Sequence, residues 1–304
     1  MSLPLVSIVL PTCNGARHLG QAIDACLRQS HVHLEVIVVD DGSTDSTSSV
    51  VAQFRDRDVR LRSVAHDRNR GLPAALNTGF ATAAGEYLTW TSDDNYHRPN
   101  AIARLVDTLA HDASIDIVYS DFTVIGSDGH PLEQRRVGDR RQLLAGNCIG
   151  ACFLYRRRVQ QALRAYDEDL FLAEDYDFWL RASTRFRMVP LHEDLYWCRD
   201  HQDSLSARFD ERAKVATDRC LAKNLAGLTW ASPAEKADAH VVLAHRALAR
   251  REWVRACRHG LSALRLAPAH AVGLVSRRIV SGRVAGRRAG RASGGRSVDP
   301  VFRD

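Results

Sequence analysis

Two kinds of hydrophobic pattern alternate along the first ninety residues. Unbroken runs rich in Val, Ile and Leu are typical of strands buried on both faces of a parallel sheet. Between these runs, apolar residues recur every three or four positions, as on one face of a helix. The predicted strands are 6–10, 34–39, 59–65 and 86–91, and the helices are 18–30, a segment after 43–45 that includes 50–54, and 72–84. This order predicts an α/β fold with a doubly wound, mostly parallel sheet and right-handed crossovers.

The alternation is less regular after about residue 95. We expect a helix from Pro99 to about 111, strands at 115–119 and 152–155, loops over 126–147 and a helix at 175–184. From about 206 to 280 the pattern is helical, with Pro233 and Pro268 as breaks. The sequence therefore predicts an α/β domain over 1–205, a helical C-terminal extension over 206–281 and a basic, disordered tail over 282–304.

Composition and cysteine usage favour a cytoplasmic protein. Hydrophobic residues make up 45% of the 304 residues, enough for a sizeable core. No apolar run approaches the roughly 20 residues of a membrane span, and the N-terminus does not resemble a signal peptide. The seven cysteines are scattered without a CxxC motif. This argues against a zinc site and favours reduced thiols in a cytosol.

Charge is distributed unevenly between the two ends of the chain. Residues 246–304 contain 14 Arg and three acids, a net +11, whereas residues 1–245 contain 28 Lys plus Arg and 33 acids, a net −5. The basic end is either a solvated tail or a segment attracted to an anionic acceptor or membrane surface. The second interpretation places the protein peripherally on the inner face of the plasma membrane. No nucleic acid partner is expected.

Two acid pairs follow predicted strands, and they are the strongest candidates for a binding site. Asp40 and Asp41 end one strand, and Asp93 and Asp94 follow another. Ligands of open α/β sheets bind outside the carboxyl ends of the strands, and carboxylates are preferred ligands of Mg²⁺ and Mn²⁺. The first pair could instead be turn and helix-cap chemistry, and the second could face water. The chain has no GxxxxGK[ST], GxGxxG or HExxH motif.

Six motifs in order resemble family 2 inverting glycosyltransferases with the GT-A fold. The resemblance extends over residues 5–206. The matching segments are 11–15 (PTCNG), 39–45 (VDDGSTD), 69–85 (NRGL to G), 92–95 (SDDN), 174–181 (EDYDFWLR) and 201–206 (HQDSLS). One departure is Thr91, at the position of the usual first acid of the DxD motif. It implies that metal coordination rests on Asp93 and His201, with reduced affinity.

The resemblance assigns a role to each matching residue. It implies a nucleotide-sugar donor, a Mg²⁺ or Mn²⁺ ion held by Asp93 and His201, and Asp175 as the catalytic base. A base is needed because the attacking acceptor hydroxyl must lose a proton. The implied donor-binding residues are Pro11, Thr12, Asn14, Asp40, Asp41, Asp67, Asn69, Gly71, Asn77, Ser92 and Asp94. From residues alone, Asp175 could equally be an acid at a helix N-terminus, and His201 a surface histidine.

The acceptor side is the least defined part of the predicted site. We expect acceptor selectivity to reside in residues 126–170. The candidate residues on the acceptor side are Gly150, Ala151, Glu174 and Trp179, and Trp179 could instead be a core residue. The expected reaction is inverting transfer of a sugar, from a UDP-sugar, to a hydroxyl of a glycan or lipid-linked acceptor in the synthesis of cell-surface polysaccharide, glycolipid or a related glycan. The alternatives are a nucleotidyltransferase and a catalytically degenerate nucleotide-sugar-binding protein.

Overall fold

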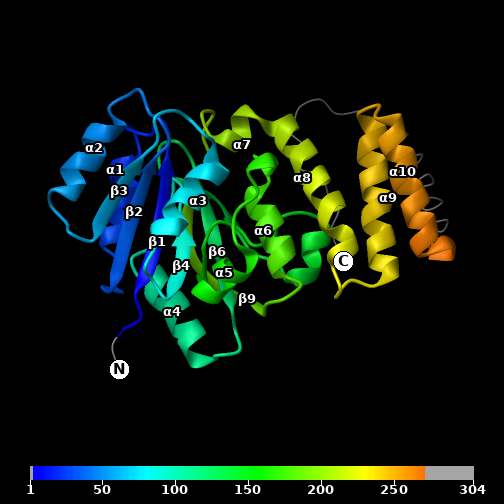
Figure 1. Ribbon diagram of the computed structural model, residues 1–304, viewed down its shortest axis with the longest axis horizontal. Coiled ribbons are helices and arrows are strands. Elements are labelled where there is room, and N and C mark those ends of the chain that lie inside the picture. The colour runs from blue at the N-terminus through cyan, green and yellow to red at the C-terminus, as the bar shows by residue number, and fades with distance from the viewer. Residues whose placement is uncertain (1–2, 271–304) are drawn as a thin grey trace. The chain divides into compact units, whose positions relative to one another are not determined.

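The computed structural model describes residues 3–270, which form two compact units divided between Ala231 and Ser232 (Figure 1). Residues 206–231 thus belong to the same unit as the sheet. The domain boundary expected near residue 205 stays a prediction. The predicted tail, 282–304, and the end of the predicted extension lie outside the described residues.

The first unit contains a nine-stranded sheet. Its strands are β1 (Val6–Thr12), β2 (Leu34–Asp40), β3 (Leu61–Ala65), β4 (Tyr87–Trp90), β5 (Tyr96–His97), β6 (Ile117–Ile125), β7 (Pro131–Arg135), β8 (Phe153–Arg156) and β9 (Met188–Arg199). Its helices are α1 (Leu19–Leu27), α2 (Thr47–Arg55), α3 (Leu72–Thr82), α4 (Ala101–His111), α5 (Arg157–Leu163), α6 (Glu174–Ala182), α7 (Leu205–Arg208) and α8 (Asp210–Asn224).

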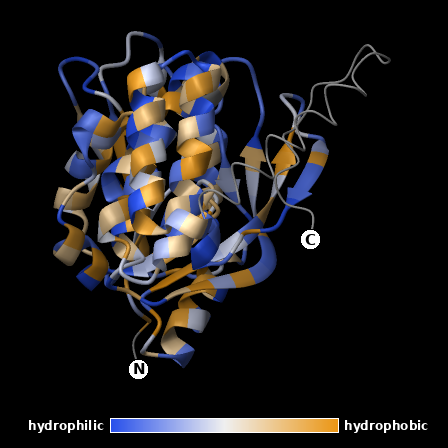
Figure 2. Ribbon diagram, turned by 90° about the vertical axis from the view of Figure 1, so that its right-hand side faces the viewer, coloured by the Kyte–Doolittle hydropathy of each residue, from blue (hydrophilic) through white to orange (hydrophobic). Residues whose placement is uncertain are grey.

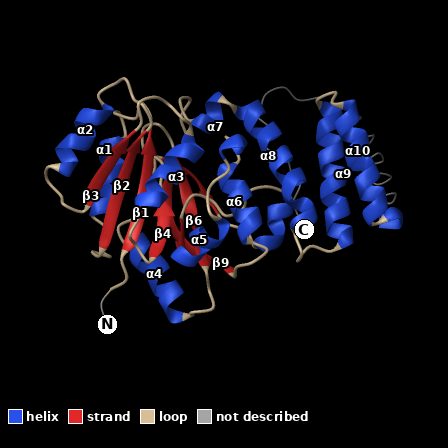
Figure 3. Cartoon of the chain, in the orientation of Figure 1, coloured by secondary structure: helices blue, strands red, loops and turns tan. Residues whose placement is uncertain are grey.

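The strand order is β3-β2-β1-β4-β8-β6-β9-β5, with β7 beside β6. Figure 3 shows β3, β2, β1 and β4 side by side in this order. The four strands predicted first, β1 to β4, are all parallel, and Thr12 pairs with Asp40 where β1 and β2 end. The other half is mixed, because β8 is antiparallel to β4 and β6 while β9 is parallel to β6. The predicted α/β class and doubly wound parallel region are therefore confirmed.

Helices cover both faces of the parallel strands. Successive side chains along a strand point to opposite faces of the sheet, so the two faces contact different helices. Ile8 and Leu10 of β1 share one hydrophobic cluster with Ile23 of α1 and Leu105 of α4. Val9, between them, faces α3. There a Cβ on Gly79 would lie 2.4 Å from Val9 Cγ1, so glycine permits the close approach of α3 to β1.

The elements with little hydrophobic pattern were not predicted from the sequence. Residues 126–147, expected as loops, contain the exposed strand β7 and a short 3₁₀ helix at Arg140–Leu144. Strand β9 was not predicted at all. It carries charged residues and a proline among its apolar positions, yet it pairs with β6 over most of its length. Backbone pairing with a neighbouring strand therefore decided its conformation.

The second unit is a helical hairpin of α9 (Pro233–Ala249) and α10 (Trp253–Leu266). Ser232 and Glu235 form a capping box at the start of α9, so Pro233 begins a helix there. Ala237 and Val241 of α9 pack against Ala263 of α10. Within residues 3–270, no helix is both long and apolar enough to cross a membrane.

Candidate functional site

Four loops meet at the carboxyl edge of the parallel strands. They follow β1, β2, β3 and β4, whose parallel pairing brings their ends to one edge. The predicted motifs of the first hundred residues lie on these loops, except that the motif 69–85 continues through α3 to Gly85, before β4. Hydrogen bonds connect the loops to one another.

Asn14 fastens the loop after β1 to the loop after β2. Its backbone has φ 56°, a left-handed conformation that asparagine tolerates better than most residues. Its side-chain Oδ1 accepts from the backbone N–H groups of Thr44 at 2.8 Å and Asp45 at 3.3 Å. Its own N–H donates to Ser43 Oγ at 2.8 Å. Asn14 therefore shapes the predicted base pocket through backbone contacts.

The two acids after β2 have different surroundings. Asp40 Oδ1 accepts from the backbone N–H of Ser43 at 2.9 Å, at the predicted nucleoside end. Asp41 is 3% exposed and accepts from the N–H groups of Arg70 and Gly71, each at 2.8 Å. His66 Nδ1 lies 2.7 Å from Asp41 Oδ1. Asp41 thus holds the loop after β3, and its expected donor contact stays a prediction.

The loop after β3 carries three further candidates. Asp67 is exposed, and Asn69 Nδ2 donates to Cys13 Sγ at 3.1 Å, which joins this loop to the one after β1. Gly71 has φ 91°, which favours glycine, and it precedes α3. Asn77, on α3, exchanges two hydrogen bonds with the backbone of Tyr166, at 2.8 and 3.0 Å. Asn77 therefore anchors a distant loop.

Asp93 sits against the loop after β1. Its Oδ2 accepts from Thr12 Oγ1 at 2.5 Å. A Cβ on Gly15 would lie 2.0 Å from the same oxygen, so only glycine leaves room for this carboxylate. Burial raises the pKa of Asp93 to about 6; the Thr12 hydrogen bond opposes this shift and neighbouring Asp94 adds to it.

Asp94 and His201 form a pair beside Asp93. His201 Nε2 lies 2.8 Å from Asp94 Oδ2. Asp94 Oδ1 and His201 Nδ1 are both buried and without a hydrogen-bond partner. The part of the chain that the structure describes has no group of three or more His, Cys, Asp or Glu side chains arranged to hold a metal ion. Two carboxylates are nonetheless what Mg²⁺ commonly takes from a protein, with phosphates completing its ligands.

Thr91 is buried against β9. The residue is 1% exposed, and its hydroxyl lies 2.7 Å from the hydroxyl of Tyr196 on β9. An acid at this position would be buried against Tyr196. The departure at Thr91 is therefore compatible with the packing beneath the loop.

Glu174 and Asp175 begin α6. Asp175 Oδ2 accepts from Asn147 Nδ2 at 2.7 Å, and Oδ1 accepts from the N–H of Tyr176 at 2.6 Å. Burial raises the pKa of Asp175. Glu174 is 5% exposed, and its Oε2 has no hydrogen-bond partner. Burial and the charge of Asp175 raise the pKa of Glu174 to about 8, so Glu174 is neutral at pH 7.

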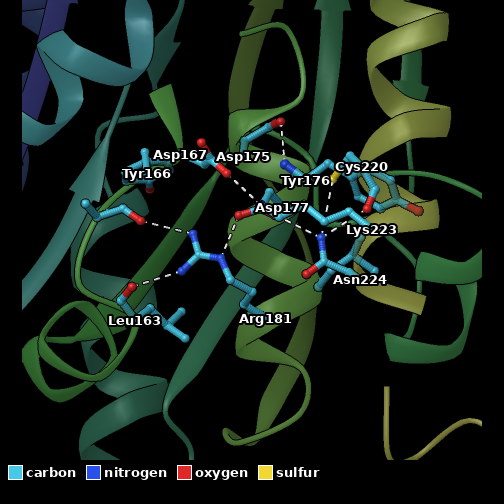
Figure 4. Close-up of polar contacts among 12 residues, drawn as sticks. Leu163, Tyr166, Asp167, Asp175, Tyr176, Asp177, Arg181, Cys220, Lys223 and Asn224 are labelled. Atoms are coloured by element: carbon cyan, nitrogen blue, oxygen red, sulfur yellow. Dashed lines mark hydrogen bonds and ion pairs between the residues drawn. The ribbon is translucent and has the colours of Figure 1, made fainter. Parts of the chain in front are cut away.

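A buried carboxylate two residues further on fixes α6 in place (Figure 4). Asp177 is fully buried and accepts from Arg181 Nε at 2.6 Å, Lys223 Nζ at 3.1 Å and Asn224 Nδ2 at 2.8 Å. Arg181 also donates to the carbonyls of Leu163 and Ala165. The network joins α6 to α8 and to the loop before α6, and so holds the helix turn that carries Asp175.

The remaining candidates divide between surface and core. Pro11 is buried at the end of β1, and Ser92 is half-buried beside Asp93. Gly150 has φ 74°, and a Cβ there would lie 2.8 Å from Phe122, while neighbouring Ala151 packs against the core. Trp179 is fully buried, 4.7 Å from Phe153 between ring centroids, so it belongs to the core, as the second interpretation of this residue expects, and not to the acceptor side.

Several residues that support the site were not identified from the sequence. Asn147 lies in a segment expected as loop, and nothing local marks it as a partner of Asp175. His66 and Asp177 are also partners of motif residues. Only Asp177 carried a signal, since it stands within the acidic motif at the start of α6.

The family model described as glycosyl transferase family 2 matches residues 7–164. The chain is 32% identical over 209 residues to an uncharacterized glycosyltransferase of Rickettsia typhi, covering 65% of this chain and 64% of the relative. It is 32% identical to the uncharacterized glycosyltransferase EpsJ of Bacillus subtilis over 67% of this chain and 63% of the relative. Two further Rickettsia relatives are spanned over only 61% and 33% of their length.

Solved structures share the fold at low sequence identity. The S. aureus TarS 1–349 structure has a TM-score of 0.64 at 18% identity, covering 88% of this chain and 82% of that chain. The mannosyltransferase PcManGT of Pyrobaculum calidifontis, solved with GDP-Man and Mn²⁺, has a TM-score of 0.61 at 19% identity, covering 95% and 82%. These neighbours confirm the expected GT-A fold. Since the family model matches more than half of the sequence, the chain belongs to glycosyl transferase family 2.

Proposed function

We propose that the protein is a metal-dependent inverting glycosyltransferase that moves a sugar from a nucleotide-diphosphate donor, a UDP-sugar, to a hydroxyl of a glycan or lipid-linked acceptor. The acceptor belongs to cell-surface polysaccharide, glycolipid or related glycan synthesis. The observation that carries the proposal is the pair of acidic groups: Asp93 and Asp94 at the strand edge, and Asp175 at the start of α6.

The interlocked loops are the proposed donor site. Asp40 binds the base or ribose, and the loops fastened by Asn14 and Asp41 form its walls. Their mutual hydrogen bonds hold them in place before the donor arrives, which lowers the entropy cost of binding. TarS has been solved with UDP and with UDP-GlcNAc, which supports a nucleotide-sugar donor here.

Asp93 and His201 would hold the divalent ion, with Asp94 beside them and phosphate oxygens of the donor completing its ligands. The residues fit such an ion, because Asp94 Oδ1 and His201 Nδ1 are buried polar atoms that lack a protein partner. A bound Mg²⁺ or Mn²⁺ would neutralise the negative charge that develops on the departing diphosphate. The protein's own contribution is to keep the Asp93 carboxylate oriented through Thr12 and Gly15.

Asp175 is the proposed base. The acceptor hydroxyl attacks the anomeric carbon from the side opposite the diphosphate, so the anomeric centre inverts and the hydroxyl proton passes to Asp175. A raised pKa strengthens a carboxylate as a base near neutral pH. The raised pKa of neighbouring Glu174 lessens the negative charge that Asp175 faces near neutral pH. Asn147 fixes the orientation of the carboxylate through its hydrogen bond to Oδ2.

Product analysis separates this proposal from the two alternatives. The protein is incubated with Mn²⁺ and a panel of nucleotide sugars, and the released nucleotide products are measured. A glycosyltransferase releases a nucleoside diphosphate, and NMR of the glycoside product shows inverted configuration. Pyrophosphate release would identify a nucleotidyltransferase, and binding without release would identify a degenerate binding protein.

We also propose a cytoplasmic location with peripheral attachment through the basic C-terminus. The support is the +11 charge of residues 246–304. Each Arg near an anionic membrane surface contributes about 1 kcal/mol of attraction. Such attachment would bring the site close to a lipid-linked acceptor.

A further inference from the structure

Helix α10 exposes a continuous apolar stripe, which we define as Trp253, Val254, Cys257, Leu261 and Leu264. The exposed fractions are 64% for Trp253, 74% for Val254, 55% for Leu261 and 44% for Leu264, and Cys257 is also exposed. Most pairs of these residues are three, four, seven or eight positions apart in the sequence, which places all five on one side of the helix. Figure 2 looks onto α9 and α10 and shows hydrophobic and hydrophilic residues alternating along both.

The stripe is not the packing face of the hairpin. The buried residues of α10 are Ala256 and Ala263, and Ala263 packs against α9. On α10 only the small side chains Ala256 and Ala263 are buried, while its larger Trp and Leu side chains are exposed. Large apolar side chains that are exposed together in one patch commonly mark an interaction surface.

Arginines border the stripe. Arg258 lies one helical turn from both Val254 and Leu261, and Arg265 lies one turn from Leu261; both arginines are exposed. Residues 253–298 contain ten arginines and no acidic residue. An apolar stripe with tryptophan, bordered by arginine, is the composition of helices that lie in the interface of anionic membranes.

We infer that the α10 stripe docks on an anionic phospholipid surface, with the apolar side chains entering the interface and Arg258 and Arg265 contacting lipid phosphates. A second copy of the chain is a poorer occupant, because a two-fold contact between stripes would bring the same arginines of both copies together. The inference rests on the proposed peripheral attachment through residues 246–304 and assigns that contact to one face of α10. It does not depend on the proposed reaction.

The test is sedimentation of the full-length protein with vesicles of phosphatidylcholine alone or mixed with phosphatidylglycerol. The variants are Leu261→Ser with Leu264→Ser, Trp253→Ser alone, and Arg258→Gln with Arg265→Gln. All these residues are exposed, so none of the changes empties the core, and circular dichroism checks the fold. The matched control is Leu132→Ser, a 63% exposed leucine on β7.

We expect the wild type to bind the anionic vesicles, and the leucine variant to bind about tenfold more weakly, since two apolar side chains leave the interface. Trp253→Ser and the arginine variant also weaken binding, while Leu132→Ser binds as the wild type does. Wild-type binding by the leucine variant, or no binding by the wild type, would overturn the inference. A wild-type dimer in light scattering that the leucine variant abolishes would assign the stripe to a second copy instead.

Discussion

Replacing Asp177 by Asn tests whether the α6 network holds the helix that carries Asp175. The carboxylate is fully buried and accepts three hydrogen bonds, two of them from cationic side chains. Asn keeps the size but offers only one acceptor oxygen, so at least one of the cations loses its partner.

The magnitude follows from the exposure of those cations. Loss of one partner of a buried ion pair costs about 3–5 kcal/mol. The Arg181 and Lys223 side chains are 24% and 46% exposed, so water replaces part of the lost contact. We therefore expect a loss of about 2 kcal/mol, near that of a hydrogen bond to a charged group. For a unit of this size, that lowers Tm by roughly 4–8 °C.

The assay is differential scanning calorimetry of the apo protein, with Asp210→Asn as the control. Asp210 pairs with Lys214 at 2.8 Å on the surface, where its side chain is 63% exposed, so its loss should cost less than about 1 kcal/mol. If Asp177→Asn unfolds at the wild-type temperature, or no earlier than the control, the network does not hold α6.

Three further predictions concern charge. Glu174→Gln should become more stable relative to wild type as pH rises from about 5 to 8. The wild-type carboxyl, with its pKa raised from 4.5 to about 8, contributes stability below its unfolded pKa that is lost as pH rises; a pH-independent difference in Tm would contradict this. Asp93→Ala should weaken UDP binding in the presence of Mn²⁺ by at least tenfold and leave metal-free binding unchanged, as measured by calorimetry; equal affinities in mutant and wild type would remove Asp93 from the metal site. Truncation after residue 281 should reduce binding to anionic vesicles, most strongly at low salt; unchanged binding would favour a solvated tail.

Hydrophobic pattern predicted the elements that bury a regular face. The strands around Ile8 and Val38, and helices α1 and α3, fall close to their expected positions because their burial repeats with the period of the element. Strand β9 and residues 131–135 escaped prediction because sheet pairing, a nonlocal contact, determines them. The two interpretations of Trp179 stayed open in the sequence because a motif position says nothing about which way a side chain points.

The candidate site shows the same division. The motifs identified the acids, but not which of them face a ligand and which hold loops. Asp41 and Asn77 could be distinguished from Asp40 only through their partners, which lie 25 to 91 residues away in the chain. Asn147 carries no local signal, since its importance comes only from its contact with Asp175.

The most direct test of the account is the turnover of Asp175→Asn. Asn has nearly the same shape, so the loops of the donor site should be retained. It offers one acceptor oxygen in place of two, so it keeps the hydrogen bond from either Asn147 or the Tyr176 N–H, and it cannot accept the acceptor proton. We predict that release of nucleoside diphosphate in the presence of acceptor falls by about 10²–10⁴-fold, while nucleotide affinity in calorimetry stays within about twofold. Asp169→Asn, an exposed acid of the preceding turn, should keep wild-type turnover. Near wild-type turnover by Asp175→Asn would contradict the assignment of the base and the mechanism built on it.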